Sequence, residues 1–162
     1  MKRLMRVVLL IANLWCATKL PPPEILGIRL GMTYSQARAN LSTIAQFKNE
    51  DEGQEVWTLR NDSHYETLIV GFDRERRVRY VTVLASPQRR AVDYSEIADV
   101  HRAISSGQPG NLVFTWKARD PKSHIDYLVI AKGSDPHRLS SYSIKRVGVQ
   151  NEEEDEESNR KK

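Results

Sequence analysis

A capped helix followed by a series of strand-like runs occurs twice in this chain, and no other feature constrains the fold as much. Thr33 and Gln36 form a capping box before a helical pattern that we expect to cover residues 34–44. Asp93, with the acidic Glu96 three positions later, precedes a second pattern expected over residues 94–105. Each pattern is followed by three runs typical of strands, at residues 55–60, 66–73 and 78–85 and again at 112–117, 125–132 and 141–149.

This order of one helix and three strands, present twice, predicts an α+β domain. The domain would contain an antiparallel sheet of about six strands with two helices on one face. The two halves also echo each other at an offset of about sixty residues, as in Tyr34 and Tyr94 or Trp57 and Trp116. The echo is consistent either with duplication of an αβββ unit or with two units that share only a general pattern.

Residues 1–17 have the pattern of a secretory signal peptide. Lys2, Arg3 and Arg6 form a cationic start, and an apolar run without charge follows up to Ala17. A helix that spans a membrane needs about 20 apolar residues, so this run is too short to span one comfortably. We therefore expect a periplasmic or secreted protein without a spanning helix.

Cys16 is the only cysteine of the chain and lies inside this N-terminal segment. If the segment is cleaved, the mature protein has no thiol for a disulfide, for thiolate catalysis or for a cysteine-based zinc site. The alternatives to cleavage are lipid attachment through Cys16, an uncleaved N-terminal anchor, or a short buried helix.

The rest of the chain divides into three parts by composition. Residues 18–26 contain three consecutive prolines and are expected to form a linker. Residues 27–150 suit one domain with a single core. Residues 151–162 carry six acidic and three basic residues and no apolar one, which predicts a disordered acidic tail.

The charge balance argues against a nucleic-acid partner. The chain carries 25 basic and 21 acidic residues, and removal of the signal segment leaves 22 basic residues. A nearly balanced charge of this kind is too weak to favour binding to a polyanion.

The segment Ile28-Arg29-Leu30-Gly31-Met32-Thr33-Tyr34-Ser35-Gln36-Ala37-Arg38 resembles the start of a helix in small bacterial envelope proteins. These are the SmpA/OmlA (BamE-like) family and the β-lactamase-inhibitor-protein-like modules. Gly71-Phe72-Asp73 before a basic turn is similar to the strand pair that follows in such modules. The resemblance covers residues 25–85 and implies a module of the bacterial cell envelope.

No pattern in the sequence indicates catalysis, a metal or a cofactor. Ser and Thr residues are plentiful, but none lies in a nucleophile elbow, and no glycine-rich loop has phosphate-binding spacing. His124 and Asp126 share one side of a strand and suggest either a dyad or a solvated strand start. The remaining histidines are far apart and set no metal-ligand spacing: His64, His101 and His137.

Aromatic residues in the expected strands offer the one functional lead. Two short helices cover only one face of a sheet, so the other face is open to a partner. We expect at least two of these aromatic side chains to be exposed there, beside Arg77 and Arg79, as a surface that binds another envelope protein. The alternatives are core packing of the aromatics, and a small-ligand carrier or hydrolase-like enzyme with a pocket between helices and sheet. The aromatic candidates are Trp57, Tyr80, Trp116, Tyr127 and Tyr142.

Overall fold

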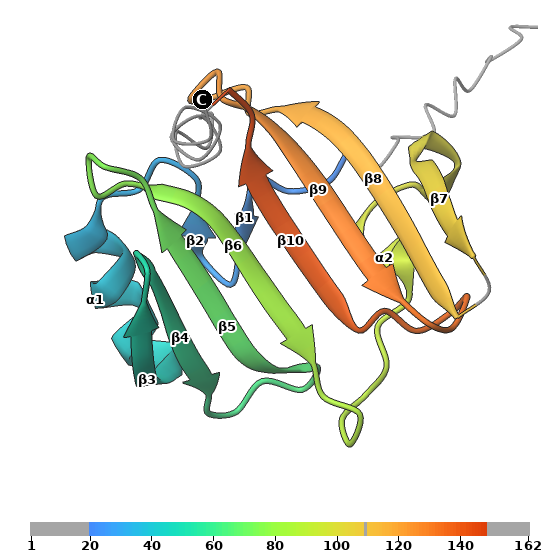
Figure 1. Ribbon diagram of the computed structural model, residues 1–162, viewed down its shortest axis with the longest axis horizontal. Helices are drawn as coiled ribbons and strands as arrows, with labels where there is room; N and C mark the ends of the chain where they lie inside the picture. The colour runs from blue at the N-terminus through green and yellow to red at the C-terminus, as the bar shows by residue number, and fades with distance from the viewer. Residues whose placement is uncertain (1–19, 109, 149–162) are drawn as a thin grey trace, which may run out of the picture.

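An eight-stranded antiparallel sheet forms the body of the protein (Figure 1). The computed structural model describes residues 20–108 and 110–148. The strand order in the sheet is β3-β4-β5-β6-β10-β9-β8-β7, so β6 and β10 pair at its centre. Each half of the sheet is a meander of four strands, because every other pair in the order is consecutive along the chain.

The first half begins with helix α1 (Tyr34–Ile44), which occupies the residues that the sequence predicts. Thr33 caps the helix as expected, since its Oγ1 accepts from the Gln36 backbone N–H and the Gln36 side chain accepts from the Thr33 backbone N–H. Ala37 and Leu41 are the buried residues of the helix. The strands that follow are β3 (Ala45–Asp51), β4 (Gln54–Leu59), β5 (Tyr65–Phe72) and β6 (Val78–Ala85).

The second half contains much less helix than the first. Helix α2 (Tyr94–Ile97) has only four residues, and a separate 3₁₀ turn, η1 (Val100–Arg102), follows it. The strands of this half are β7 (Ile104–Gln108), β8 (Asn111–Arg119), β9 (Asp126–Gly133) and β10 (Ser141–Arg146).

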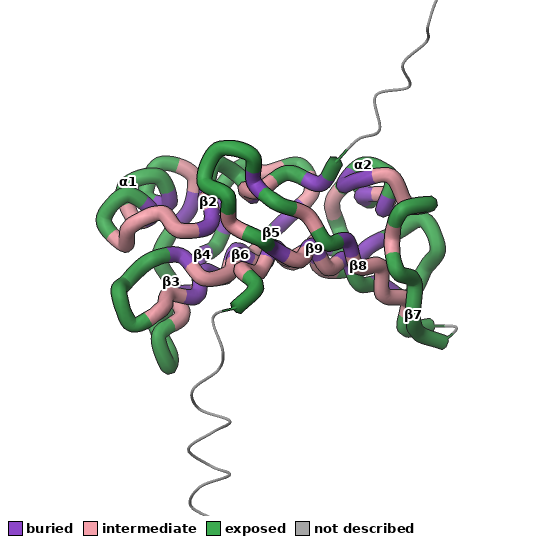
Figure 2. Tube along the Cα trace, turned by 90° about the horizontal axis from the view of Figure 1, so that it is seen from above, coloured by how far each residue is buried: buried purple, intermediate pink, exposed green. Residues whose placement is uncertain are grey.

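One side of the sheet is covered and the other is not (Figure 2). Helices α1 and α2 lie on the covered side, together with a hairpin of β1 (Glu24–Ile25) and β2 (Ile28–Arg29). In this view the outer strands β3 and β7 lie lower than the middle strands, so the uncovered side is concave.

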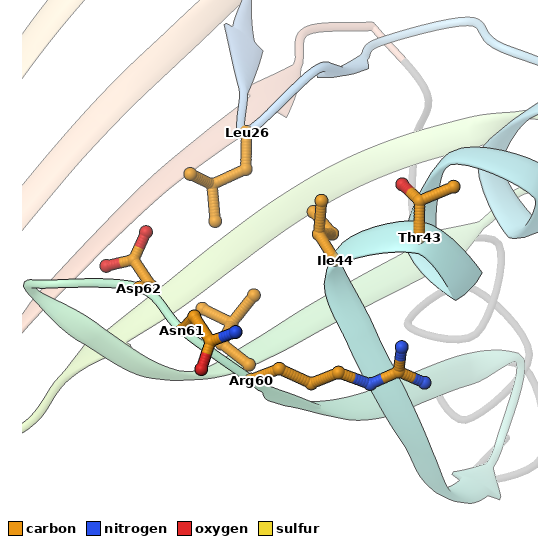
Figure 3. Close-up of a pocket in the computed structure, with 7 residues that line it drawn as sticks. Leu26, Thr43, Ile44, Arg60, Asn61 and Asp62 are labelled. Atoms are coloured by element: carbon orange, nitrogen blue, oxygen red, sulfur yellow. The ribbon is translucent and has the colours of Figure 1, made fainter.

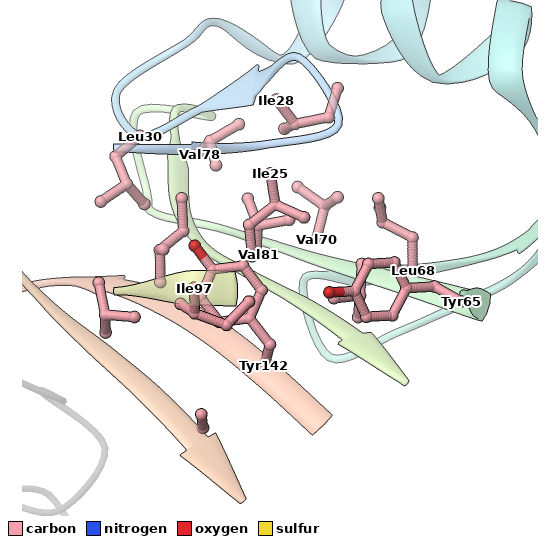
Figure 4. Close-up of a cluster of buried hydrophobic side chains, with 14 of the residues drawn as sticks. Ile25, Ile28, Leu30, Tyr65, Leu68, Val70, Val78, Val81, Ile97 and Tyr142 are labelled. Carbon is pink, nitrogen blue, oxygen red and sulfur yellow. The ribbon is translucent and has the colours of Figure 1, made fainter. Parts of the chain in front are cut away.

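The core lies between the hairpin and the centre of the sheet (Figure 4). Ile25 and Ile28 of the hairpin point toward β5, β6 and β10, where Val70 and Val81 are completely buried. Burial of such aliphatic side chains stabilises the fold by about 1.5–3 kcal/mol each. The hairpin therefore closes the core where the two halves of the sheet meet.

The predicted fold class, an α+β domain of about six strands and two helices, is wrong. The described part of the chain is mainly β, with ten strands, eight of them in one sheet, and with α1 as its one helix of several turns. A repeated αβββ unit does not describe it either, since each meander has four strands. The additional strands are the two ends of the sheet, β3 and β7.

The second helix ends early because of local competition at Asp99. Ala98 is already extended, with φ −159° and ψ 176°, and the Asp99 side chain accepts from the His101 backbone N–H to cap a new turn. Asp side chains commonly compete with a helix in this way. Ile104, expected on the buried face of the helix, instead lies in β7 opposite Thr115 and is 61% exposed.

The domain also begins earlier than its predicted boundary at residue 27. Residues 24 and 25 form β1, and the carbonyl of Pro21 accepts a 2.7 Å hydrogen bond from the buried Tyr127 hydroxyl. Part of the expected linker therefore belongs to the fold. The signal segment 1–17 and the acidic tail 151–162 lie outside the described residues. No helix among the described residues is long and apolar enough to cross a membrane.

Candidate functional site

The side of the sheet opposite α1, α2 and the β1–β2 hairpin carries no other element of the described chain, and we call it the bare face (Figure 2). One row of paired residues crosses its six inner strands, and all of its members are half-buried. They have aliphatic or hydroxyl side chains and none is charged. In spatial order they are Val56, Ile69, Thr82, Ser143, Ile130 and Thr115.

Two further rows flank this central row on the bare face. The first is Thr58, Thr67, Leu84, Ser141, Lys132 and Val113. The second is Gln54, Gly71, Tyr80, Lys145, Leu128 and Lys117. The face is thus apolar and hydroxyl-rich at its centre and basic on the side formed by β8, β9 and β10.

Tyr80 lies flat across the neighbouring strand on the bare face. A Cβ atom at Gly71 would be only 2.0 Å from Cε1 of the Tyr80 ring, so the ring needs a glycine beneath it. The Tyr80 hydroxyl donates a 2.6 Å hydrogen bond to Oε1 of Gln54 on β4. Burial raises the pKa of this hydroxyl, which therefore stays protonated at neutral pH. The ring extends the apolar surface toward β4.

Three lysines give the basic side of the bare face its charge. Lys145 and Lys117 stand on either side of Leu128, and Lys132 lies further along β9. Their cross-strand neighbours are uncharged, and none of the three forms an ion pair with another described residue. Arg119, at the end of β8, is 3.8 Å from Asp126 and is thereby partly neutralised.

The expected patch of exposed aromatic residues is not present. Of the five candidates only Tyr80 lies on the bare face, and it is half-buried. The other four are buried on the covered side, with 3–4% of their surface exposed: Trp57, Trp116, Tyr127 and Tyr142. The alternative that the sequence left open, core packing, describes these four side chains.

Three of the buried aromatics also use their polar atoms within the fold. Trp57 Nε1 donates to Oε2 of Glu55 at 3.1 Å, and Trp116 Nε1 donates to the Asp99 carbonyl at 2.9 Å. Tyr127 donates to Pro21, as described above. These bonds hold the rings in place on the covered side. The fourth buried aromatic is Tyr142, and burial raises the pKa of its hydroxyl.

Arg77 and Arg79 do not join one surface with the aromatic residues. Arg77 is exposed at the β5–β6 turn, where its guanidinium donates to the Gly31 carbonyl and lies 3.5 Å from the Glu75 carboxylate. Arg79 is half-buried, with its guanidinium carbon 5.5 Å from the centre of the Tyr80 ring. Arg77 therefore braces the turn against the segment before α1, while Arg79 packs beside Tyr80.

One buried carboxylate on the covered side was not predicted from the sequence. Glu55 is completely buried and accepts from the Tyr34 hydroxyl at 2.8 Å, with Nε of Arg38 at 3.4 Å. The Arg38 guanidinium in turn lies 5.0–5.5 Å from the ring centres of Tyr34, Phe47 and Trp57. The strand alternation, which puts Glu55 on the same side as Trp57, was the signal that could have revealed it.

A cavity of about 430 Å³ opens between the end of α1, the β1–β2 turn and the β4–β5 loop (Figure 3). Its aliphatic lining is Leu26, Ile44 and Leu59, and its polar lining is Thr43, Arg60, Asn61 and Asp62. Leu26 lies in the left-handed region at φ +51°, which is strained for this residue type. The cavity is therefore small and partly polar, and it lies at one end of α1.

No cluster of three potential metal ligands occurs among the described residues. Asp126 makes its ion pair with Arg119, and His124 lies in the turn before β9 at φ +57°. His137 is 3.1 Å from Asp93, but 86% of its side chain is exposed to solvent. These contacts cap and brace turns.

Comparisons with known proteins found no relative of this chain. No protein family, no curated protein and no solved structure matches the chain.

Proposed function

We propose that this protein is a non-catalytic module that binds another protein through the bare face. The observation that carries the proposal is the central row from Val56 to Thr115, which crosses six strands without cover from the described chain. A concave, mainly uncharged surface of half-buried side chains has the composition of the centre of a protein interface. Tyr80, Ile69 and Ile130 would anchor the partner, because the four other aromatic candidates are buried.

The charge of the bare face indicates which kind of partner surface would fit it. Lys117, Lys132 and Lys145 stand beside the apolar row without acidic partners among the described residues. Charge complementarity at the rim of an interface favours association with an oppositely charged surface. We propose a partner that presents acidic side chains next to an apolar patch.

We propose that the protein acts in the bacterial periplasm or is secreted, as a module similar to the envelope proteins named above. The support for this is the pattern of residues 1–17 and the segment 28–38. Expression in a Gram-negative host followed by fractionation and mass spectrometry tests it. A periplasmic product shortened by about 17–20 residues is expected. Full-length protein in the cytosol would overturn the proposal, and fatty acid on Cys16 would replace cleavage with lipid anchoring.

Site-specific photo-crosslinking tests the binding face. A photoreactive residue at Ser143, at the centre of the bare face, should capture a discrete partner in an envelope extract. The matched control carries the same residue at Ser35, which is exposed on α1 on the opposite side of the sheet. Competition by unlabelled protein should abolish the product at Ser143, and Ile69→Lys in the competitor should remove its effect. Equal products at both positions, or none at Ser143, would refute a specific binding face.

The cavity beside Leu26 favours a second candidate function, the binding of a small molecule. Its aliphatic floor suits an apolar group, and Asn61 and Asp62 supply polar atoms at its edge. Thermal shift measurements with small aliphatic amines and alcohols test this candidate, with Leu59→Trp as a variant that fills the cavity. A ligand that stabilises the natural protein but not the variant would support it, while equal shifts would not.

A further inference from the structure

We propose that the acidic segment 152–157 of this chain docks on the lysine side of the bare face of the same molecule. This segment reads Glu-Glu-Glu-Asp-Glu-Glu, and the proposed receptors are Lys117, Lys132 and Lys145. The contact itself does not depend on the proposed partner. Its consequence, competition with that partner for one surface, rests on the proposed function.

The described chain ends on the correct side of the sheet for this contact. The Val147 backbone N–H donates to the Asp126 carbonyl at 2.8 Å, so the chain continues to follow β9 beyond the end of β10. Gly148, the last described residue, has a φ of +84° and is exposed. Figures 1 and 2 together show that the described chain ends on the concave, bare side, whereas its start packs on the covered side, where the Pro21 carbonyl accepts from Tyr127.

The distances allow the segment to reach all three lysines. Glu152 follows Gly148 by four residues, which span at most about 14 Å when extended. Lys145 lies three residues before Gly148, and Lys117 stands two strands from it, at a lateral distance of about 10 Å. Lys132 is four residues from Leu128 along β9, about 13 Å further, and is within reach of the later acidic residues.

The electrostatic setting of the three lysines favours an acidic segment. On this half of the face the described carboxylate of Asp126 is paired with Arg119. Individual ion pairs between exposed side chains are weak. A tether of a few residues offsets this weakness, because it holds the segment at an effective concentration of order mM.

Lysine labelling with an acetylating reagent, read by mass spectrometry, tests the contact in the isolated full chain. In the variant with the six acidic residues 152–157 replaced by their amides, we expect labelling at Lys117, Lys132 and Lys145 to rise roughly twofold or more. Lys48, exposed on β3 at the other end of the sheet, is the matched control and should be unchanged. In 1 M salt, where the Debye length is about 3 Å, natural protein and variant should label alike.

Equal labelling of the natural protein and the amide variant at low salt would overturn the proposal. Protection that falls on dilution would assign the contact to a second copy of the chain and would overturn the intramolecular form. A charge reversal completes the test: Lys117→Glu with Lys145→Glu should remove the protection of Lys132, because the two new carboxylates repel the acidic segment. The photo-crosslinking at Ser143 uses a partner, so either experiment can fail while the other succeeds.

Discussion

Thr82 and Ser143 face each other across the β6–β10 pair, with Oγ1 and Oγ 2.9 Å apart, at the centre of the bare face. The register on both sides of this pair is equivalent, since Ile69 pairs with Thr82 as Ile130 pairs with Ser143. The same holds one strand further out, where Val56 and Thr115 pair with these two isoleucines. The two meanders are therefore related by an approximate twofold axis through the hydroxyl pair.

This hydroxyl pair should contribute measurably to the association of the two halves. Thr82→Val and Ser143→Ala each remove one partner, and each should lower the free energy of unfolding by about 0.5–1.5 kcal/mol. The double variant should lose less free energy of unfolding than the two single variants lose together, because it leaves no unpaired hydroxyl. Urea denaturation of the four proteins measures the coupling. Ser141→Ala, on the same strand but opposite Leu84, is the control and should stay within about 0.5 kcal/mol of the natural protein. Strict additivity would show that the pair does not act as a unit.

The two buried tryptophans should behave as core residues. Trp57→Ala and Trp116→Ala each leave a large cavity under the covering layer, and each should lower the free energy of unfolding by about 3–5 kcal/mol. Thermal melts measure this. Ile69→Ala and Ile130→Ala remove half-buried side chains of the bare face and should cost less. Natural melting temperatures for both tryptophan variants would mean that these rings are not in the core.

Periodicity in the sequence was sufficient to predict α1 and the six inner strands. The helical pattern over residues 34–44 and the strand run over 78–85 coincide with α1 and β6. The outer strands β3 and β7 were not predictable in this way, because they lack alternation. Only Ala45 is buried in β3, and every residue of β7 is exposed. Such polar edge strands are held by pairing with a neighbour rather than by burial.

The face that each aromatic residue occupies could not be decided from the sequence. Strands such as β9 have apolar residues on both sides, with Val129 on the covered side and Ile130 on the bare face. The choice is made by the hairpin that contains Ile25 and Ile28, and its first strand, β1, lies in the segment that was expected to be a linker. The cavity is lined in part by Leu26 of the same hairpin, so the sequence did not predict its position either.

Leu26 should be a site where a substitution stabilises the protein. Leu26 and Gly27 have φ values of +51° and +78°, the conformation of a type I′ turn, in which Asn is favoured at the first position. Leu26→Asn should raise the free energy of unfolding by about 1 kcal/mol, because it relieves the left-handed strain. Chemical denaturation measures the change. Gly27→Ala is the opposite control: no atom lies within 4 Å of an added Cβ, so its expected loss of stability comes from the backbone alone. A less stable Leu26→Asn variant would show that contacts of Leu26 in the cavity outweigh the strain.

The buried carboxylate of Asp120 should make the protein sensitive to acid. Ser123 Oγ donates to Oδ2 at 2.6 Å, the Lys122 backbone N–H donates to Oδ1 at 3.0 Å, and Arg29 donates to Oδ2 at 3.0 Å. These bonds to the ionised form hold the pKa of Asp120 below its ordinary value of 3.8. Because the pKa is lower in the folded state, this contribution to stability is complete above the unfolded pKa. It is lost as the pH falls through the folded value.

Asp120→Asn should therefore lower the free energy of unfolding at pH 7 and flatten its decline below about pH 4. Urea denaturation at a series of pH values between about 7 and 2 measures both effects. Asp126→Asn is the matched control, because 61% of that side chain is exposed and its ion pair with Arg119 is 3.8 Å long. Exposed pairs of this kind contribute little, so its curve should follow that of the natural protein. An Asp120→Asn curve parallel to the natural one would show that the Asp120 carboxylate does not link folding to proton binding.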